Sequence, residues 1–144
     1  MNAWIIEPPD ERAVGPDAWL KFAQSCVGLV RAGHGYDGVL LEDLCFQAHQ
    51  AAERVLKGVL LTVGVEAPRT HSIALLLTLV EQAGFSVPEP VKDSAALTPY
   101  SVRTRTPGGP EVTEDDYREA LQQAEKLVAW AATQIQSRTA PQPG

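Results

Sequence analysis

The sequence predicts an all-α protein, built as an up-and-down bundle of four to five helices. Apolar residues recur at three- and four-residue intervals through several long segments, as they do on one face of a helix. No segment of convincing length alternates apolar and polar residues in the way that a half-buried strand would. Because no amphipathic helix can bury its apolar stripe alone, the predicted helices must pack against one another.

The chain has 144 residues, a length that suits one domain with a single core. Its apolar content of 44% and charged content of 21% are ordinary for a globular protein. Residues 1–15 are rich in proline and charge and are expected to form an N-terminal arm. Residues 16–136 are expected to form the helical bundle, and residues 137–144 a flexible tail.

The first helix is predicted over residues 16–31. Pro16 suits the first turn, where its missing N–H costs no hydrogen bond, and Asp17 complements the positive end of the helix dipole. The helix is expected to end before Gly33. A turn-rich loop over residues 32–38 then leads into the next helix.

The longest periodic segment, residues 39–63, predicts a long second helix. The small residues Ala48 and Ala52 allow a neighbouring helix to approach closely at mid-length. Gly64 can end the helix as a left-handed cap, and Pro68 prevents its resumption. The apolar stripe of this helix consists of Leu41, Leu44, Cys45, Ala48, Ala52, Val55, Leu56, Val59, Leu60 and Val63.

Three further helices are expected. Residues 71–83, dense in leucine, would form a largely buried helix that Thr70 caps, and residues 88–96 a short one. The last helix is predicted over residues 113–136. Thr113 offers a hydroxyl to its exposed amides, and the acidic residues that follow complement the dipole at its start.

Bulk properties exclude several classes of protein. Cys26 and Cys45 lie far apart among apolar residues, so they are interpreted as buried thiols and not as a disulfide or zinc framework. No apolar run approaches the roughly 18 residues that span a bilayer. The start of the chain lacks the pattern of a secretion signal, so a cytoplasmic protein without a membrane segment is expected.

The net charge of −6 opposes binding of nucleic acid through overall charge, so any such contact has to be local. Residues 99–110 are the candidate, because this stretch contains Arg103 and Arg105 and no acidic residue.

Three stretches of the chain contain motifs with a recognisable order. Residues 44–57, with the order LCFQAHQAAERVLK, resemble the signature of the long central helix of the HEPN family. Residues 70–73 resemble its Thr-His-Asp-Leu element, with Ser72 where an acid is usual. Residues 97–108 are similar to a segment ending in Arg-Tyr-Pro, with Thr106 at the tyrosine position. The matches together cover residues 19 to 131.

The resemblance implies a helical bundle that commonly forms a homodimer. It also implies membership of the branch often encoded beside a minimal nucleotidyltransferase in a toxin–antitoxin arrangement, and a link to RNA or nucleotides. No cofactor or metal is expected.

HEPN ribonucleases use an arginine and a histidine four to six residues apart. Histidine can then act as a general acid or base, and arginine can stabilise the charge of the phosphate in the transition state. None of the three histidines of this chain has an arginine at that spacing. The sequence therefore predicts no catalytic residues and favours a protein that is not an enzyme. A displaced pair of His71 with Arg69 or Arg105 is the alternative.

Each histidine also has a structural interpretation. His71 can make a local hydrogen bond at the start of a helix, His49 can be a polar residue on a helix flank, and His34 a mobile loop residue between glycines. With no acidic or cysteine partner at a convincing metal spacing, a ligand role for His49 is disfavoured.

The resemblance and the charges together suggest a ligand-binding surface. Glu53, Arg54 and Lys57 can form a polar groove with Gln50, or simply a solvated helix face. Arginine in the 99–110 stretch can hold a phosphate through forked hydrogen bonds, or cap carbonyls and pair with an acid such as Glu114. The candidate ligand-binding residues are Gln50, Glu53, Lys57, Arg69, His71, Tyr100, Arg103 and Arg105.

These observations favour a non-catalytic HEPN protein that acts as a homodimer or as the partner of a minimal nucleotidyltransferase and contacts a nucleotide or RNA. Tyr100 could then stack on a base, although an aromatic residue at the edge of the bundle is the more usual role. The alternatives are a metal-independent ribonuclease toxin with a non-standard Arg/His pair and a purely structural dimerisation module.

Overall fold

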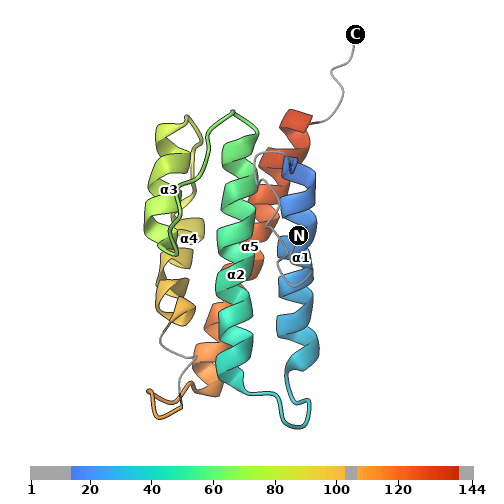
Figure 1. Cartoon of the computed structure of the whole chain (residues 1–144), viewed down its shortest axis with the longest axis vertical. Coiled ribbons are helices and arrows are strands. Elements are labelled where there is room, and N and C mark those ends of the chain that lie inside the picture. Colours follow the sequence, from blue (N-terminus) through green and yellow to red (C-terminus); the bar gives the residue numbers. More distant parts are fainter. Residues whose placement is uncertain (1–13, 103–106, 140–144) are drawn as a thin grey trace, which may run out of the picture.

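The computed structural model describes residues 14–102 and 107–139, and its regular elements over these residues are all helical. The prediction of an all-α bundle is therefore confirmed. Figure 1 shows the long helices side by side, with the shorter ones together along one side of the bundle. The elements are α1 (Pro16–Gly33), α2 (Leu41–Leu61), α3 (Ile73–Gln82), α4 (Glu89–Lys92), the 3₁₀ helix η2 (Asp93–Ser101) and α5 (Glu114–Thr139).

The end of α2 confirms the predicted cap at Gly64, and α3 ends in a similar way. Gly64 follows α2 with a φ of 72°, and the Val65 N–H returns to the Leu60 carbonyl at 3.0 Å. Gly84 follows α3 with a φ of 105°. A left-handed residue at this position lets the chain turn back and use carbonyls that the helix leaves unpaired. Both helices therefore end where the sequence predicts, within two residues.

The start of α3 differs from the prediction. Ser72, and not Thr70, is the capping residue, because the Ser72 Oγ accepts a hydrogen bond from the Leu75 N–H at 3.2 Å. The Thr70 Oγ1 instead accepts from the Ser72 N–H at 3.0 Å. Thr70 therefore stabilises the turn before the helix, and His71 lies outside the helix.

The region of the predicted short helix 88–96 is longer and of mixed type. Four residues of α helix pass directly into η2, which continues to Ser101 and includes Pro99. The inward-facing side chains explain the extension: Leu97 is fully buried, and the buried Ser94 hydroxyl donates to the Val91 carbonyl at 2.7 Å. Burial against the bundle holds a 3₁₀ segment longer than such helices usually run.

The start of α5 confirms that the Thr113 hydroxyl caps this helix, within a capping box that Asp116 completes. The Asp116 N–H donates to the Thr113 Oγ1 at 3.1 Å, and the Thr113 N–H donates to the Asp116 Oδ2 at 2.9 Å. The helix extends three residues past its predicted end, to Thr139, so residues 137–139 of the predicted tail are helical. The Arg138 guanidinium lies 4.4 Å from the centre of the Phe85 ring, a contact that favours this last turn.

The core lies where α2 meets α1 and α5, and the predicted close approach at the small residues of α2 is confirmed. Ala48, Ala51 and Ala52 are all fully buried. Gly58 is one turn and a half further along α2, where Trp19 of α1 and Ile135 of α5 come so near that an added Cβ would lie 3.1 and 3.2 Å from their atoms.

Both cysteines are free and buried, as predicted. Burial raises the pKa of the Cys45 thiol to about 12, with smaller contributions from the carboxylates of Asp116 and Glu42. Burial also raises the pKa of Cys26, against the effect of the Arg54 guanidinium. No helix in the described part of the chain combines the length and the apolarity that crossing a membrane requires.

The high pKa of Cys45 predicts a loss of stability in alkali. The folded state keeps the thiol protonated, whereas the unfolded chain releases its proton near the ordinary thiol pKa of 9.0. The contribution of Cys45 is thus complete below pH 9 and declines as the pH rises toward 12, by up to about 1.4 kcal/mol per pH unit. Urea unfolding at pH 8, 9 and 10 measures this slope. It should be smaller in Cys45→Ala, and equal slopes in the two proteins would contradict the assignment.

Candidate functional site

The polar face of α2 converges on the residues just before α3. Glu53 is 7% exposed although it is a carboxylate. Its Oε1 accepts a hydrogen bond from the His71 Nδ1 at 2.7 Å, and its Oε2 lies 3.9 Å from the Lys57 Nζ. A buried charge needs such partners, because desolvation otherwise disfavours its charged form. The two candidate residues Glu53 and His71 therefore form a pair, and Lys57 supplies a more distant positive charge.

The path of the chain explains why His71 reaches Glu53. After α2 ends, the segment 62–72 runs back along the bundle before α3 begins (Figure 1). His71 thus returns to the level of Glu53, 18 residues earlier in the sequence. The prediction that His71 makes a local hydrogen bond is wrong, because its side-chain partner lies on α2, 18 residues away.

The Glu53 carboxylate sets the orientation of the His71 ring. A carboxylate can only accept, so the Nδ1 of His71 carries the hydrogen and its Nε2 is left without a bond to Glu53. The side chain of His71 is 69% exposed. A histidine held by a carboxylate at one nitrogen, with the other accessible, can donate to an anion or exchange a proton with a bound group.

His49 holds the backbone of the same residue. It lies one helical turn before Glu53 on α2, and its Nε2 donates to the His71 carbonyl at 2.9 Å. The two imidazole rings meet edge to face with centroids 6.1 Å apart. His49 is fully buried, because the segment before α3 covers this flank of α2. His49 and Glu53 together fix both the main chain and the side chain of His71.

A small pocket lies beside the Glu53–His71 pair. Its volume is about 240 Å³, and it is bounded by α2, the segment before α3 and the end of η2. Phe46 and Val102 supply its apolar surface, and its other lining residues are polar. The lining residues are Phe46, Gln50, Glu53, His71, Ser101 and Val102. Three of the candidate residues thus line one pocket.

Other polar residues of α2 have different surroundings. The Lys57 Nζ lies 5.5 Å from the centre of the Trp19 ring, next to α1, and Lys57 does not line the pocket. Arg54 also faces α1, where its Nη1 donates to the Cys26 Sγ at 3.2 Å. Arg54 therefore belongs to the contact between α1 and α2, and not to the predicted polar groove.

Among the residues that the structure describes, the remaining candidates do not line the pocket. Arg69 is exposed on the segment before α3. Tyr100 is half-buried against the core at the end of η2, which supports its interpretation as an edge aromatic. Arg103 and Arg105 lie outside the described residues. Glu114, the acid suggested as a partner for an arginine of that stretch, is bonded to His34.

His34 is a structural residue at the other end of the bundle. Its Nε2 lies 2.8 Å from the Glu114 Oε2, and its ring stacks on Tyr117 with centroids 4.4 Å apart. The Tyr117 hydroxyl in turn donates to the Val30 carbonyl at 2.9 Å. The prediction of a mobile loop position is wrong, because these contacts connect the end of α1 to the start of α5.

Comparisons with known proteins agree with this architecture. The family model of the HEPN domain matches residues 19–135. The chain belongs to the HEPN domain family. No curated protein matches it significantly.

Two solved structures are similar to this HEPN chain. The crystal structure of TT1696 from Thermus thermophilus has a TM-score of 0.72 and 31% sequence identity, and the match covers 83% of this chain and 97% of that one. The structure of ST0689, described as an archaeal HEPN homologue, has a TM-score of 0.67 and 28% identity, with coverage of 85% and 98%. The match spans nearly the whole of both structures.

The HEPN chain has no group of three metal-binding side chains among the residues the structure describes. Its pocket includes residues that the candidate set lacks, namely Phe46, Ser101 and Val102. The sequence spacing could have indicated Phe46 as a pocket residue, because it lies four residues before Gln50 and so on the same face of α2. The positions of Ser101 and Val102 depend on the length of η2, which no pattern in the sequence predicts.

Proposed function

We propose that this HEPN protein is non-catalytic and binds a nucleotide, free or within single-stranded RNA, in the pocket beside Glu53 and His71. The observation that carries the proposal is the Glu53–His71 pair, in which a buried carboxylate orients an exposed imidazole at the rim of a small cavity. Following the family resemblance, the protein would act as a homodimer or as the partner of a minimal nucleotidyltransferase in a toxin–antitoxin module.

The pocket chemistry suits one nucleobase. Phe46 and Val102 offer apolar surface to a ring, and Gln50 offers both a donor and an acceptor to its polar edge. The Ser101 hydroxyl donates to the Thr98 carbonyl, so its oxygen still has lone pairs for a donor of the base. At about 240 Å³ the pocket is smaller than the roughly 300–1,000 Å³ that enclose a whole ligand. The sugar and phosphate would therefore lie outside it.

The phosphate would lie outside the pocket, near the exposed side chains before α3. The His71 side chain is 69% exposed, and Arg69, which supplies a positive charge, is exposed two residues earlier in the chain. This local charge opposes a net charge of −6, so binding should be weak and should decline with salt.

Substitutions at the pocket test the proposal. We expect His71→Ala and Gln50→Ala each to weaken binding of AMP, GMP and a short single-stranded RNA about tenfold, or about 1.4 kcal/mol, in a calorimetric or fluorescence titration. His34→Ala is the matched control, because it also removes a histidine paired with a glutamate, at the other end of the bundle. No binding by the wild type, or equal losses in all three variants, would reject the pocket.

A ribonuclease remains the second candidate, because a carboxylate that orients a histidine is also an arrangement for proton transfer. The purified protein would then cut RNA in the presence of a chelator, and His71→Ala would abolish the cutting. Intact RNA after long incubation would reject this candidate.

Two further measurements separate the remaining roles. Recovery of a minimal nucleotidyltransferase by the tagged protein would support the partner role. A stable oligomer without any ligand would indicate a purely structural dimerisation module.

A further inference from the structure

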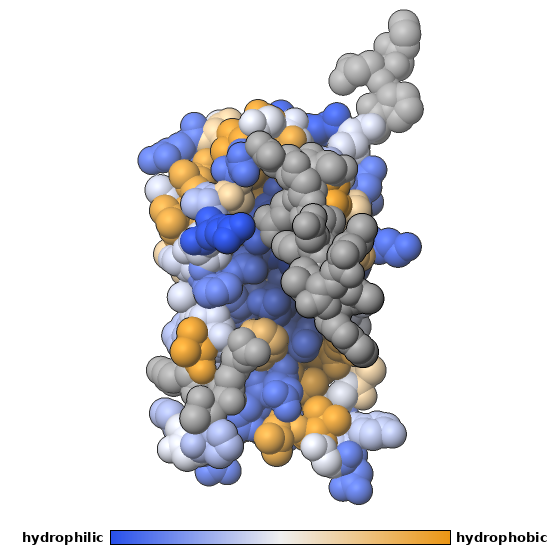
Figure 2. All heavy atoms as spheres, in the orientation of Figure 1, coloured by the Kyte–Doolittle hydropathy of each residue, from blue (hydrophilic) through white to orange (hydrophobic). Residues whose placement is uncertain are grey.

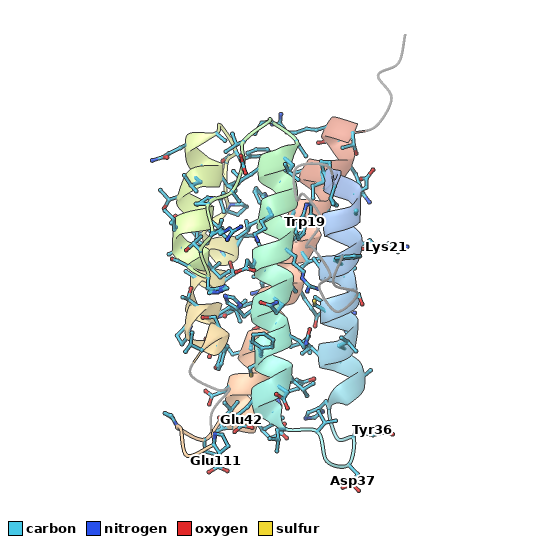
Figure 3. All side chains as sticks on the ribbon, viewed as in Figure 1. Trp19, Lys21, Tyr36, Asp37, Glu42 and Glu111 are labelled. Atoms are coloured by element: carbon cyan, nitrogen blue, oxygen red, sulfur yellow. The ribbon has the colours of Figure 1, made fainter. Side chains whose placement is uncertain are left out.

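Large apolar side chains are exposed along the seam between α1 and α2. Phe22 is 54% exposed and Leu29 is 53% exposed, and their spacing of seven residues puts them on one side of α1. Figure 2 shows hydrophobic surface gathered toward the lower end of this face. Trp19 lies near the upper end of the seam, and Tyr36 lies in the loop at its lower end (Figure 3). Such a surface usually marks a contact with another segment or molecule.

A groove of about 600 Å³ lies at the lower end of the seam, where α1 leads into α2. Its lining is mostly apolar, and Asp43 is the acidic residue of that lining. Further up, the seam is basic. The Arg54 guanidinium lies 5.8 Å from the centre of the Phe22 ring, and the Lys57 Nζ lies 5.5 Å from the centre of the Trp19 ring. The seam therefore offers an apolar hollow at one end and positive charge toward the start of α1.

The sequence of residues 1–13 is complementary to this surface. Of the residues outside the described ranges, these alone include large apolar side chains, in the run Trp4, Ile5 and Ile6. The acidic residues Asp10 and Glu11 follow, between that run and the start of α1. The order apolar, acidic, α1 along the chain thus matches the order hollow, positive charge, start of α1 along the seam.

The length of the segment also fits. An extended chain spans about 3.3 Å per residue, so from Val14 it reaches about 10 Å at Glu11 and about 26 Å at Ile6. From the start of α1, at about 1.5 Å per residue, Phe22 lies about 9 Å along the helix and Leu29 about 20 Å. A segment that runs back along the seam therefore brings an acid level with the basic stretch and the apolar run level with the hollow.

We propose that residues 4–6 dock in the groove of their own molecule and that the acidic residues after them pair with Arg54. In an extended segment alternate side chains share one side, so Trp4 and Ile6 enter the hollow together. The indole N–H of Trp4 then donates to the Asp43 carboxylate, the acceptor that the groove lining supplies. The N-terminal segment thus forms a strap that ties the start of α1 to the loop between α1 and α2.

The inference goes beyond the proposed nucleotide site and does not rest on it. The two surfaces meet at Phe46, which lines both the groove and the pocket. A docked strap therefore occupies the groove side of Phe46 and leaves the pocket side open to a ligand.

Paramagnetic relaxation in the full chain tests the docking. Both native thiols are buried, so a nitroxide can be attached selectively to Asn2→Cys. The nitroxide should broaden the amide signals of Tyr36 and Val39, at the groove, beyond detection. It should leave the signal of Ser137 sharp, because the end of α5 lies at the opposite end of the bundle (Figure 1).

Substitutions on both sides of the contact should release the strap. Leu29→Glu places a carboxylate in the hollow, and Trp4→Ala removes the side chain that fills it, so each should abolish the broadening. Leu75→Glu is the matched control, because it changes an exposed leucine on α3 and should leave the broadening intact. Circular dichroism of each variant separates release of the strap from loss of the fold.

Charge exchange tests the path of the strap. Arg54→Glu and Glu11→Arg should each shift the docking equilibrium about fivefold toward the free segment, as expected for one partly exposed ion pair. The double variant should recover the broadening, because unlike charges face each other again. Two losses that simply add in the double variant would reject this path.

A mixing experiment separates the segment of the same chain from that of a second copy. Spin-labelled protein without ¹⁵N is mixed with ¹⁵N-labelled protein without the nitroxide, and the groove signals should stay sharp. Broadening in the mixture would assign the groove to another molecule and overturn the proposal. No broadening in the spin-labelled chain itself, or broadening that persists in Leu29→Glu, would overturn it as well.

Discussion

Replacing Leu56 by alanine should lower the unfolding free energy by about 3 kcal/mol. The side chain is fully buried in the second half of α2, the helix that contacts both α1 and α5. Truncation removes buried methyl groups and leaves a cavity that rigid helices on either side cannot close. Urea unfolding measures the loss, and the melting temperature should fall by roughly 10 °C for a domain of this size.

Leu75→Ala is the matched control for this substitution. It removes the same atoms from a side chain on α3 that is 43% exposed, and it should change stability by no more than about 0.5 kcal/mol. Equal stability of the Leu56 and Leu75 variants would mean that the core is not where α2 meets its neighbours.

Gly58→Val should destabilise the bundle by about 2–3 kcal/mol, although valine is the better helix former. A Cβ at this position would lie 3.1 Å from the Trp19 Cβ, 3.2 Å from the Ile135 Cδ1 and 3.3 Å from the Pro16 carbonyl oxygen. The Trp19 Cβ and the Pro16 carbonyl oxygen are fixed to the backbone of α1, so they cannot move away unless α1 itself moves. Thermal unfolding and urea unfolding should both show the loss.

Gly28→Val provides the comparison, because no heavy atom lies within 4 Å of a Cβ built at Gly28. In the middle of an exposed stretch of α1 the substitution should leave stability unchanged or raise it by about a few tenths of a kcal/mol. A Gly58→Val protein as stable as Gly28→Val would show that α1 and α2 do not approach each other this closely.

The close approach of α1 and α2 also bears on the candidate site. Trp19, which meets Gly58, lies against the Lys57 ammonium, and Lys57 in turn lies near the Glu53 carboxylate. Packing of the two helices thus positions one of the charges around the Glu53–His71 pair. A core substitution can therefore disturb the pocket without touching its lining.

Local chemistry was sufficient to predict the helices. The spacing of apolar residues, the Thr113 and Asp116 capping box and the positive φ of Gly64 all act within a few residues of each other. Predictions failed where burial competed with local preference. The 3₁₀ helix η2 extends beyond the predicted short helix because the side chains of Leu97 and Ser94 are buried against the bundle.

The candidate site was predicted in part. Gln50 and Glu53 share a face of α2 by spacing alone, and His71 was singled out by its motif. The burial of His49 could not be predicted, because it depends on how closely the segment before α3 covers α2. The same segment decides that His71 bonds to Glu53 and not to a neighbour in the chain.

The amino-acid sequence by itself determined the helical class, the order of the helices and the membership of the HEPN family, because periodicity, caps and motifs are properties of neighbouring residues. Only the tertiary structure decided which polar residues meet: it paired Glu53 with His71, turned Arg54 toward α1 and tied His34 to Glu114. The physical reason is that these contacts join residues 18 to 80 positions apart, and their geometry follows from how the apolar stripes pack.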